Sequence, residues 1–332
     1  MTTLPTGFSA YVANLGIKDT SDDFVIVAGD SVCTTVGMFT TSSFAGPSVI
    51  VSREHLASPT ARAVVVISKN ANVATGSEGL ANAREVVAGV ATALGCAASE
   101  VLIASTGVIG RQYPMNHVRA GLAAIPSPLP CADVEPIARG IMTTDTVPKI
   151  AETTVGKARI VGVAKGVGMI EPNMATMITM LLTDADVDAG DLDPIFKRVV
   201  DRTFNCVSID TDTSTSDTAI VMASGTAGAV DLDAFERGVY EVAASLSKQI
   251  ARDGEGAEKL IEVTVEAAAT PEQAKRVAKA IVNSPLVKTA VHGADPNWGR
   301  VAMAIGKSTT ADEVSVEGRH PLRRSGGLSD AR

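Results

Sequence analysis

The residues best suited to chemistry lie in one glycine-rich segment near the middle of the chain. Lys165–Thr176 (KGVGMIEPNMAT) follows an apolar run that is typical of a buried strand. Its glycines could approach a phosphate, but a GxG pair alone is a weak signal and no Walker-type Lys-Ser/Thr follows. An ordinary loop between two strands is the simplest alternative. A third interpretation fits the segment better: the loop presents Thr176 at the mouth of the next strand.

Thr176 could act as a nucleophile if the peptide bond before it were broken. A threonine hydroxyl ionises poorly and needs a base close by. Cleavage between Ala175 and Thr176 would give Thr176 a free α-amine, which titrates at about 7.7–8.0 and suits a general base near neutral pH. In this cleavage the Thr176 hydroxyl attacks the Ala175 carbonyl, and water then hydrolyses the resulting ester. The pattern alone still favours the ordinary loop.

A second candidate site is the small-residue turn Ser105-Thr106-Gly107, which follows another apolar run. Such a turn exposes backbone N–H groups and a hydroxyl, the groups that an oxyanion hole needs. An ordinary turn at the end of a strand is the alternative, and the pattern favours it. By pattern alone, Lys165 and Glu255 are likewise more typical of solvated charges.

Two further motifs resemble sites of other protein classes. Asp210–Ser214 (DTDTS) resembles the nucleophile loop of haloacid-dehalogenase-type phosphatases, but Ser214 stands where Thr or Val is expected and no paired acidic motif follows. The same stretch lacks the glycine and glutamate of an EF-hand. We therefore expect Asp210–Thr218 to form a hydrogen-bonded loop. His292–Arg300 holds the only tryptophan, and we expect a packed, hydrogen-bonded turn there rather than a catalytic histidine.

The elements that must position these residues follow an α/β pattern, with apolar strands and amphipathic helices in alternation. Gly95 is a natural helix stop, and Asp193-Pro194 is expected to open a helix. Ile261–Glu266 alternates apolar and polar residues, like a strand with one wet face. Strands are expected at 63–68, 101–104, 159–164, 177–182 and 261–266, and helices at 78–94, from 193, at 235–250 and from a capping box at 270–273. Layered sheets with helices outside are the expected architecture.

Composition narrows the classes of function. The 332-residue chain has a net charge of -8 and a pI of about 5.1, which argues against a nucleic-acid partner. No apolar run is long enough to span a bilayer, and the first ten residues do not resemble a signal peptide. The four cysteines and four histidines show no metal-binding spacing. We therefore expect a cytoplasmic protein without a disulfide, a metal site or a membrane partner.

Several motifs together resemble the ornithine acetyltransferase (glutamate N-acetyltransferase) family. Lys165–Met177 is similar to the self-cleavage signature of that family, and the other motifs occur in the family's order over roughly residues 7 to 310. These are Ala104–Gly110 (ASTGVIG), Ile141–Thr146 (IMTTDT), Asp210–Thr218 (DTDTSTSDT), Asp253–Gly256 (DGEG) and His292–Arg300 (HGADPNWGR). The variant at Ile109–Met115 (IGRQYPM) looks closest to members from clavulanic acid gene clusters.

The resemblance implies a fold and an activity. The fold would be an α-β-β-α sandwich related to N-terminal-nucleophile enzymes, cleaved into an α chain (1–175) and a β chain (176–332) that assemble as α2β2. The enzyme would move an acetyl group from N-acetylornithine to glutamate through an acetyl-threonine, as in arginine biosynthesis. It would need no metal or organic cofactor, and acetyl-CoA would be a secondary donor.

The resemblance also assigns roles to individual residues. Thr176 would be the nucleophile, and Thr106 with Gly107 the oxyanion hole. The substrate-binding residues would be Thr143 (with Thr144 as the alternative), Lys165, Thr176 and Glu255. A lysine suits the carboxylate of an acetylated amino acid, and a glutamate suits the ammonium of ornithine.

The chain departs from the family pattern near Lys307–Asp312. Family members continue for several tens of residues, with an asparagine and a threonine that close over the substrate. Two alternatives therefore stay open: an inactive, truncated homologue, and an aminopeptidase or amidase of the same N-terminal-nucleophile type. The phosphatase interpretation of Asp210 ranks below both.

Overall fold

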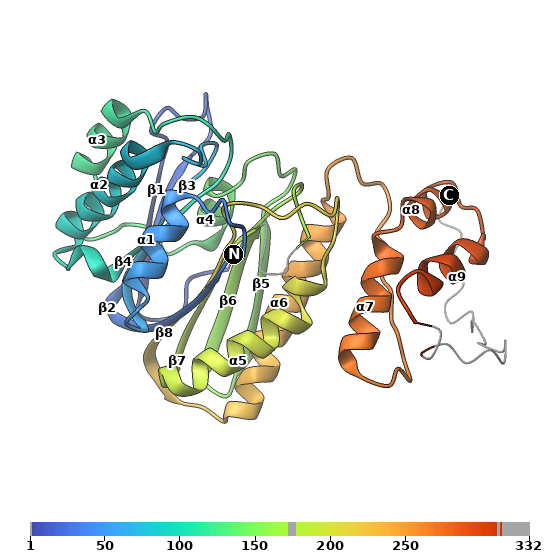
Figure 1. Cartoon of the computed structure of the whole chain (residues 1–332). Coiled ribbons are helices and arrows are strands. Elements are labelled where there is room, and N and C mark those ends of the chain that lie inside the picture. Colours follow the sequence, from blue (N-terminus) through green and yellow to red (C-terminus); the bar gives the residue numbers. More distant parts are fainter. Residues whose placement is uncertain (1, 172–176, 311–312, 314–332) are drawn as a thin grey trace. The chain divides into compact units, whose positions relative to one another are not determined.

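The computed structural model describes residues 2–171, 177–310 and 313 (Figure 1). The chain divides into two compact units, Met1–Leu260 and Ile261–Arg332. The strands of the first unit are β1 (Phe8–Ala13), β2 (Phe24–Phe39), β3 (Thr60–Ile67), β4 (Val101–Ser105), β5 (Lys149–Val155), β6 (Ala158–Lys165), β7 (Ile178–Asp186) and β8 (Thr218–Ala229). Its helices are α1 (Pro47–His55), α2 (Gly76–Leu94), α3 (Met115–Ala123), α4 (Val134–Gly140), α5 (Ala189–Arg202) and α6 (Leu232–Arg252). The second unit contains α7 (Pro271–Val282), α8 (Pro285–His292) and α9 (Trp298–Gly306).

The strands of the first unit form one continuous hydrogen-bonded path with the order β4-β3-β2-β8-β7-β6-β5, and β1 pairs with β2. The long strand β2 belongs to both halves of this path. Its residues 24–29 pair with β1 and its residues 24–28, 33 and 34 with β3, whereas residues 34–39 pair with β8. The register shifts between Ala28 and Cys33, so one strand connects two packed halves of the sheet.

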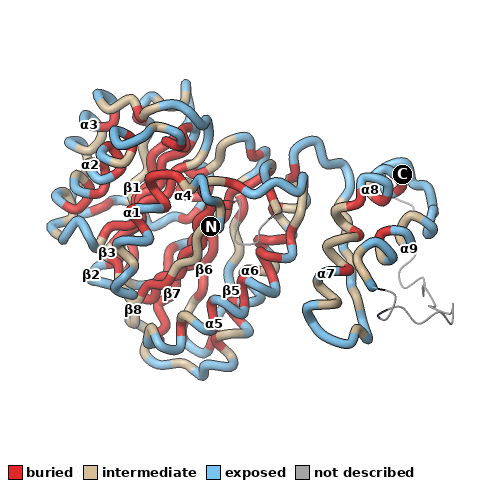
Figure 2. The backbone as a smooth tube through the Cα atoms, viewed as in Figure 1, coloured by how far each residue is buried: buried red, intermediate tan, exposed pale blue. Residues whose placement is uncertain are grey.

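The two halves lie face to face, with an apolar layer between them. Because side chains alternate along a strand, Val25 of β2 and Val161 of β6 enter one shared cluster. Phe24 of β2 instead packs toward α2 and α3, and Ile160 of β6 packs toward α5 and α6. The resulting layers are helix, sheet, sheet and helix, and Figure 2 shows the buried strands between exposed helix surfaces. This confirms the expected α-β-β-α sandwich.

The expected strands and helices of the first unit are confirmed, with bounds that differ by up to four residues: β3 and α6 begin three residues earlier than expected, and β7 ends four residues later. Helix α2 ends at Gly95, which adopts the left-handed conformation with φ +66°. The helix expected to open at Asp193-Pro194 begins earlier, at Ala189, with Asp188 as its N-cap. Pro194 is tolerated in the second turn because the missing N–H faces the carbonyl of Gly190, an exposed residue that water can reach.

The second unit differs from the expectation in two places. Ile261–Glu266 shows the predicted alternation of burial, but it forms no strand pairing within the described residues. Val263 and Val265 pack instead against the small apolar cluster around Val277 and Ile281. A strand needs a partner for its N–H and C=O groups, and no described segment supplies one here. Across the described part of the chain, no helix is both long and apolar enough to cross a bilayer.

Candidate functional site

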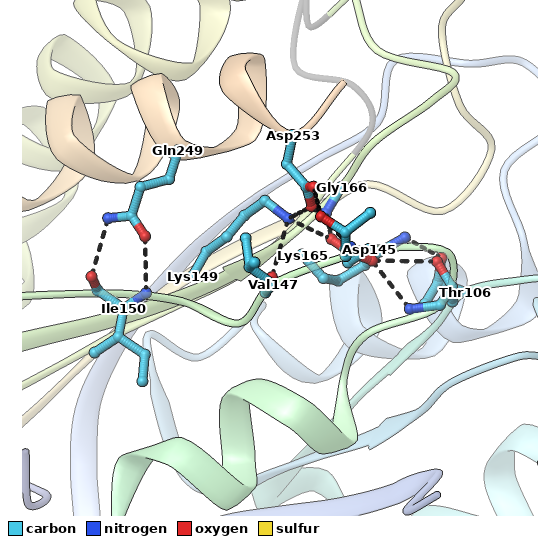
Figure 3. A network of polar contacts seen from close by, with 11 residues as sticks. Thr106, Asp145, Val147, Lys149, Ile150, Lys165, Gly166, Gln249 and Asp253 are labelled. Carbon is cyan, nitrogen blue, oxygen red and sulfur yellow. Dashed lines mark hydrogen bonds and ion pairs between the residues drawn. The ribbon is translucent and has the colours of Figure 1, made fainter. Parts of the chain in front are cut away.

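Two predicted site residues from distant parts of the chain touch each other. Lys165 is the last residue of β6, and Thr106 directly follows β4. The Lys165 ammonium donates a hydrogen bond of 3.2 Å to Thr106 Oγ1 (Figure 3). Only 6% of Lys165 is exposed, so the interpretation of this residue as a solvated charge is wrong. A buried ammonium beside a hydroxyl is suited to hold an anionic group.

The turn at Gly107 can form only with glycine. Gly107 has φ +131°, and an added Cβ would lie 2.1 Å from the backbone carbon of Lys69. The N–H groups on either side are engaged: Thr106 donates to the Ile67 carbonyl and Val108 to the Lys69 carbonyl, both at 3.0 Å. The turn is therefore pressed onto the neighbouring chain in one fixed shape, as a preorganised oxyanion hole requires.

A buried polar network on both sides of this turn in the sequence supports it, and the sequence pattern did not predict it. The Ser105 and Tyr113 hydroxyls share a hydrogen bond, and burial raises the pKa of Tyr113, so its hydroxyl stays protonated. Asn70 Nδ2 donates to the Gln112 carbonyl at 2.9 Å, and Gln112 Nε2 donates to the Thr75 carbonyl at 2.9 Å. Polar residues in loops carry no signal of such pairing, because their partners are far apart in sequence.

Thr143 is linked to Lys165 through Asp145. The Asp145 carboxylate accepts a hydrogen bond from the Thr143 N–H at 3.0 Å and another from the Gly166 N–H at 2.6 Å. Gly166 is the residue after Lys165, so the two segments are fixed side by side. Thr143 is half-buried, whereas Thr144 is exposed. This placement favours Thr143 over Thr144 as the residue that faces the site.

The charges around Lys165 set its ionisation. Burial lowers the pKa of Lys165 below its ordinary value of 10.5, and Lys149 adds to that effect, whereas Asp145 and Asp217 raise the pKa by attraction. For Asp145, burial works to raise the pKa, but Lys165 and Lys149 hold it below its usual value. Asp145 is therefore ionised at neutral pH, and the Lys165 ammonium loses its proton at a lower pH than an exposed lysine.

Glu255 lies against the loop that follows Lys165. Its N–H donates to the Val167 carbonyl at 2.7 Å, and a Cβ on Gly168 would lie 2.8 Å from Glu255 Oε2. The residue is exposed, as its sequence pattern indicated. The structure thus brings Glu255 to the segment of Lys165, with its carboxylate open to a ligand.

Ala175 and Thr176 lie outside the described residues, but the strand that begins two residues after Thr176 is paired on both sides. The parallel partner of β7 is β8, and Thr218 N–H donates to the Met177 carbonyl at 2.9 Å. On its other side β7 pairs with β6, and Ile178 lies opposite Lys165. Strand β7 therefore begins beside the buried ammonium.

Asp210 anchors the loop that leads away from Lys165. Its carboxylate accepts hydrogen bonds from the N–H groups of Met169, Ile170 and Asp212, the last two at 2.8 and 3.1 Å. The Ile209 N–H also donates to the Ile170 carbonyl at 2.6 Å. The expected hydrogen-bonded loop is confirmed, and the three backbone donors give Asp210 a structural role rather than that of a phosphatase nucleophile.

Asp217 is a buried carboxylate at the same end of the sheet. It is 3% exposed, and neither oxygen has a hydrogen-bond donor in good geometry within the described chain. Burial raises the pKa of Asp217 well above its ordinary value, while the nearby Thr40 hydroxyl, Met177 N–H and Lys165 lower it only partly. Folding therefore favours the protonated form of this group.

We expect Asp217→Asn to stabilise the protein at neutral pH. The native state binds this proton more tightly than the unfolded state, so stability falls as pH rises above the ordinary pKa of 3.8. The neutral amide removes that fall. Thermal unfolding should show a melting temperature about 2–4 °C above wild type at pH 8 and a smaller difference near pH 4. Equal differences at both pH values would contradict this assignment.

The motif His292–Arg300 has a different environment from the one expected. It forms a hydrogen-bonded turn between α8 and α9, including a bond of 2.8 Å from the Asp295 N–H to the Ala290 carbonyl. Trp298 is 67% exposed, however, so the expectation of a packed turn is wrong. Apolar contacts in this unit come from the other faces of the helices. Within the described residues, no cluster of His, Cys, Asp or Glu is arranged to hold a metal ion.

The fold and the site define the class of this protein. It is an α-β-β-α sandwich in which a turn that requires glycine, a threonine hydroxyl and a buried lysine meet at one end of the sheet. Sequence comparison gives the family. Residues 9–331 match the sequence model of the ArgJ family. The chain belongs to the ArgJ family.

Relatives of known name agree with this family. The chain is 58% identical over 313 residues to "Arginine biosynthesis bifunctional protein ArgJ 2" of a Nostoc strain. The aligned region covers 94% of this chain and 81% of that protein. It is 56% identical over 314 residues to "Glutamate N-acetyltransferase Oat2" of Streptomyces clavuligerus, with 94% and 80% covered. The solved ornithine acetyltransferase of Mycobacterium tuberculosis, in complex with ornithine, is 28% identical, with a TM-score of 0.43 over 52% of this chain and 94% of that chain.

Proposed function

We propose that this chain is a self-processing acetyltransferase that carries an acetyl group from N-acetylornithine to glutamate on Thr176. The observation that carries the proposal is the contact between Lys165 and Thr106, beside the start of β7. It joins the residues proposed for substrate and oxyanion binding in a member of the ArgJ family. The proposed ligand-binding groups thus converge on the strand that directly follows Thr176.

Self-cleavage comes first in this mechanism. The Thr176 hydroxyl attacks the Ala175 carbonyl, the C–N bond breaks, and the new amine takes the hydroxyl proton. Water then hydrolyses the ester, which leaves a carboxylate on Ala175 and a free hydroxyl and α-amine on Thr176. The α-amine, with a pKa of about 7.7–8.0 in an unperturbed chain, serves as the general base.

Acetyl transfer then proceeds in two half-reactions. The α-amine takes the Thr176 hydroxyl proton as the oxygen attacks the acetyl carbonyl of N-acetylornithine. Thr106 Oγ1 and the Gly107 N–H stabilise the oxyanion. The bond to the ornithine nitrogen breaks, the proton passes to that nitrogen, and ornithine leaves. Glutamate attacks the acetyl ester through its amine, and the same steps in reverse give N-acetylglutamate.

The binding roles follow from charge. The Lys165 ammonium binds the α-carboxylate of the acetylated amino acid, a charge-assisted contact. Glu255, exposed beside the loop after Lys165, receives the side-chain ammonium of ornithine. Thr143 completes the binding site from the segment that Asp145 fixes. No metal or organic cofactor takes part in the proposed cycle.

The proposed cleavage would leave the two fragments interleaved in one sheet. Strands β6 and β7 lie on opposite sides of the break and pair through residues 160–165 and 178–183. β2, from the first fragment, pairs with β8 from the second. We therefore propose that the α chain (1–175) and the β chain (176–332) stay associated. The resemblance to the family suggests that two such pairs assemble as α2β2.

The activity is tested by incubating the purified protein with N-acetylornithine and glutamate. We expect ornithine and N-acetylglutamate in equal amounts, without added metal or coenzyme. Acetyl-CoA in place of N-acetylornithine tests the secondary donor. An absence of N-acetylglutamate would favour the inactive homologue. Continued release of ornithine without glutamate, well beyond one equivalent per enzyme, would favour an amidase.

We expect Lys165→Met to raise the KM for N-acetylornithine by about ten- to a hundredfold, the size of one lost hydrogen bond to a charged group. Initial rates at several donor concentrations give the KM. In the wild type the KM should rise at high pH, beginning below 10.5, because the pKa of Lys165 is lowered by burial and by Lys149 more than Asp145 and Asp217 raise it. Lys165→Met should lack this rise. An unchanged KM would remove Lys165 from the binding site.

A further inference from the structure

Four charged side chains with little exposure lie close together next to the residues proposed to bind substrate (Figure 3). This charge cluster consists of Lys149, Asp145, Asp253 and Lys165. Two ammonium groups and two carboxylates balance, so the cluster is neutral as a whole. None of Lys149, Asp145 and Asp253 belongs to the residues assigned to the reaction.

Lys149 is the centre of the cluster. Its Nζ lies 2.8 Å from Asp145 Oδ1 and 2.6 Å from Asp253 Oδ2. The Lys149 and Asp145 side chains are completely buried, and that of Asp253 is 6% exposed. A buried ammonium is costly unless several acceptors surround it. Two carboxylates and the Val147 carbonyl at 3.5 Å supply them here.

Each carboxylate that Lys149 holds fixes a segment of the binding site. Asp145 accepts the N–H groups of Thr143 and Gly166, at 3.0 and 2.6 Å. Asp253 accepts the Thr146 N–H at 3.1 Å, caps the end of α6 and stands two residues before Glu255. One ammonium thus connects the segments that contain Thr143, Gly166 and Glu255, and the first and last of these lie more than a hundred residues apart in the sequence.

We propose that Lys149 is a positioning residue for substrate binding: through Asp145 and Asp253 it sets the relative places of Thr143, Lys165 and Glu255. The inference rests on the proposed function, since those three residues are the ones assigned to the substrate. Lys149 itself touches no substrate. Its role is to keep Lys165, which binds the carboxylate, and Glu255, which binds the ammonium, at the distance that N-acetylornithine requires.

Other contacts already hold the same elements together, which separates positioning from general stability. Helix α6 packs on the sheet through the buried side chains of Val242 and Leu246. Gln249 also exchanges two hydrogen bonds with the Ile150 backbone, at 3.2 and 2.9 Å (Figure 3). Lys149 is therefore dispensable for the packing of α6 on the sheet. Its removal should instead shift the backbone segments that Asp145 and Asp253 hold.

The backbone of the oxyanion turn is anchored outside the charge cluster. The Thr106 and Val108 N–H groups donate to the Ile67 and Lys69 carbonyls, and the turn meets the cluster only where Lys165 donates to the Thr106 hydroxyl. Loss of Lys149 should therefore disturb binding more than the chemical step. A displacement of about 1 Å in a site costs up to about a hundredfold in efficiency.

The test compares Lys149→Met with Lys149→Met/Asp253→Asn, which keeps the cluster neutral. Lys197→Met is the control, because Lys197 forms an exposed ion pair with Asp193 within α5. For each protein, intact mass reports self-cleavage, thermal unfolding reports stability, and initial rates give kcat and the KM for each substrate. We expect both Lys149 variants to cleave themselves and to show a KM for N-acetylornithine raised about tenfold or more, with a smaller change in kcat.

The outcomes separate this inference from the proposed function. If wild type transfers no acetyl group, the proposed function fails. If wild type is active and the folded Lys149 variants keep its KM within the range of Lys197→Met, the positioning role is wrong. Failure of both Lys149 variants to fold, or loss of self-cleavage in folded protein, would also overturn it, since either result assigns Lys149 to the fold as a whole. A raised KM in cleaved, folded variants supports it.

Discussion

Thr176→Ala is expected to abolish acetyl transfer and to leave the chain in one piece. Alanine has no hydroxyl to attack the Ala175 carbonyl, and without that break no α-amine forms to act as base. Loss of the nucleophile from an enzyme with a covalent intermediate lowers kcat by about a millionfold. Initial rates of N-acetylglutamate formation with saturating substrates measure the effect.

Two matched variants show whether the hydroxyl is responsible. Thr176→Ser keeps a hydroxyl and, after cleavage, an α-amine, so it should retain cleavage and part of the activity. Thr92→Ala removes an exposed hydroxyl from α2, whose one hydrogen bond to a described residue is to the Ala88 carbonyl, and should behave like wild type. Transfer by Thr176→Ala at a rate within about tenfold of wild type would exclude the proposed covalent cycle.

Gly107→Ala is expected to lower kcat by about a hundred- to a thousandfold, the size of one lost oxyanion donor. The new Cβ would lie 2.1 Å from the backbone carbon of Lys69 and 2.6 Å from the Asn70 nitrogen, at a φ of +131°. Backbone atoms cannot yield as a flexible side chain can. The turn must therefore move, and the N–H that we propose as an oxyanion donor moves with it. The KM should change less, because the backbone at Lys165 and Glu255 is held by other contacts: β6 pairs with β7, Gly166 donates to Asp145, and Glu255 donates to Val167.

Two controls distinguish this effect from a general loss of structure. Gly190→Ala adds a Cβ in open space in α5 and should leave kcat unchanged. Thr106→Val removes the other proposed oxyanion donor without a change in size, and we expect kcat to fall by about ten- to a hundredfold. A Gly107→Ala protein with the melting temperature and the kcat of wild type would show that this turn does not serve the reaction.

The sequence predicted the layers of the fold because its central strands are continuous apolar runs. Residues such as Val64 and Val65 face opposite clusters, and both are apolar because both faces of the strand are covered. The pattern failed where an element depends on partners from elsewhere. Ile261–Glu266 has the alternation of a strand, yet no described segment pairs with it.

The candidate site was predictable only through the family resemblance. By pattern alone, Lys165 is an ordinary solvated lysine, and its burial depends on Asp145 and on the Thr106 turn, which come from other parts of the chain. Lys149 carried no signal at all. It is the first residue of β5, and only the structure shows that two carboxylates from separate segments surround it.

Intact mass spectrometry of the wild type, before and after a brief exposure to N-acetylornithine without glutamate, tests the central claim most directly. We expect two fragments that divide between Ala175 and Thr176, and after exposure a second fragment heavier by one acetyl group that disappears when glutamate is added. A single unbroken chain, or a second fragment that never gains the acetyl group while ornithine is released, would contradict the account.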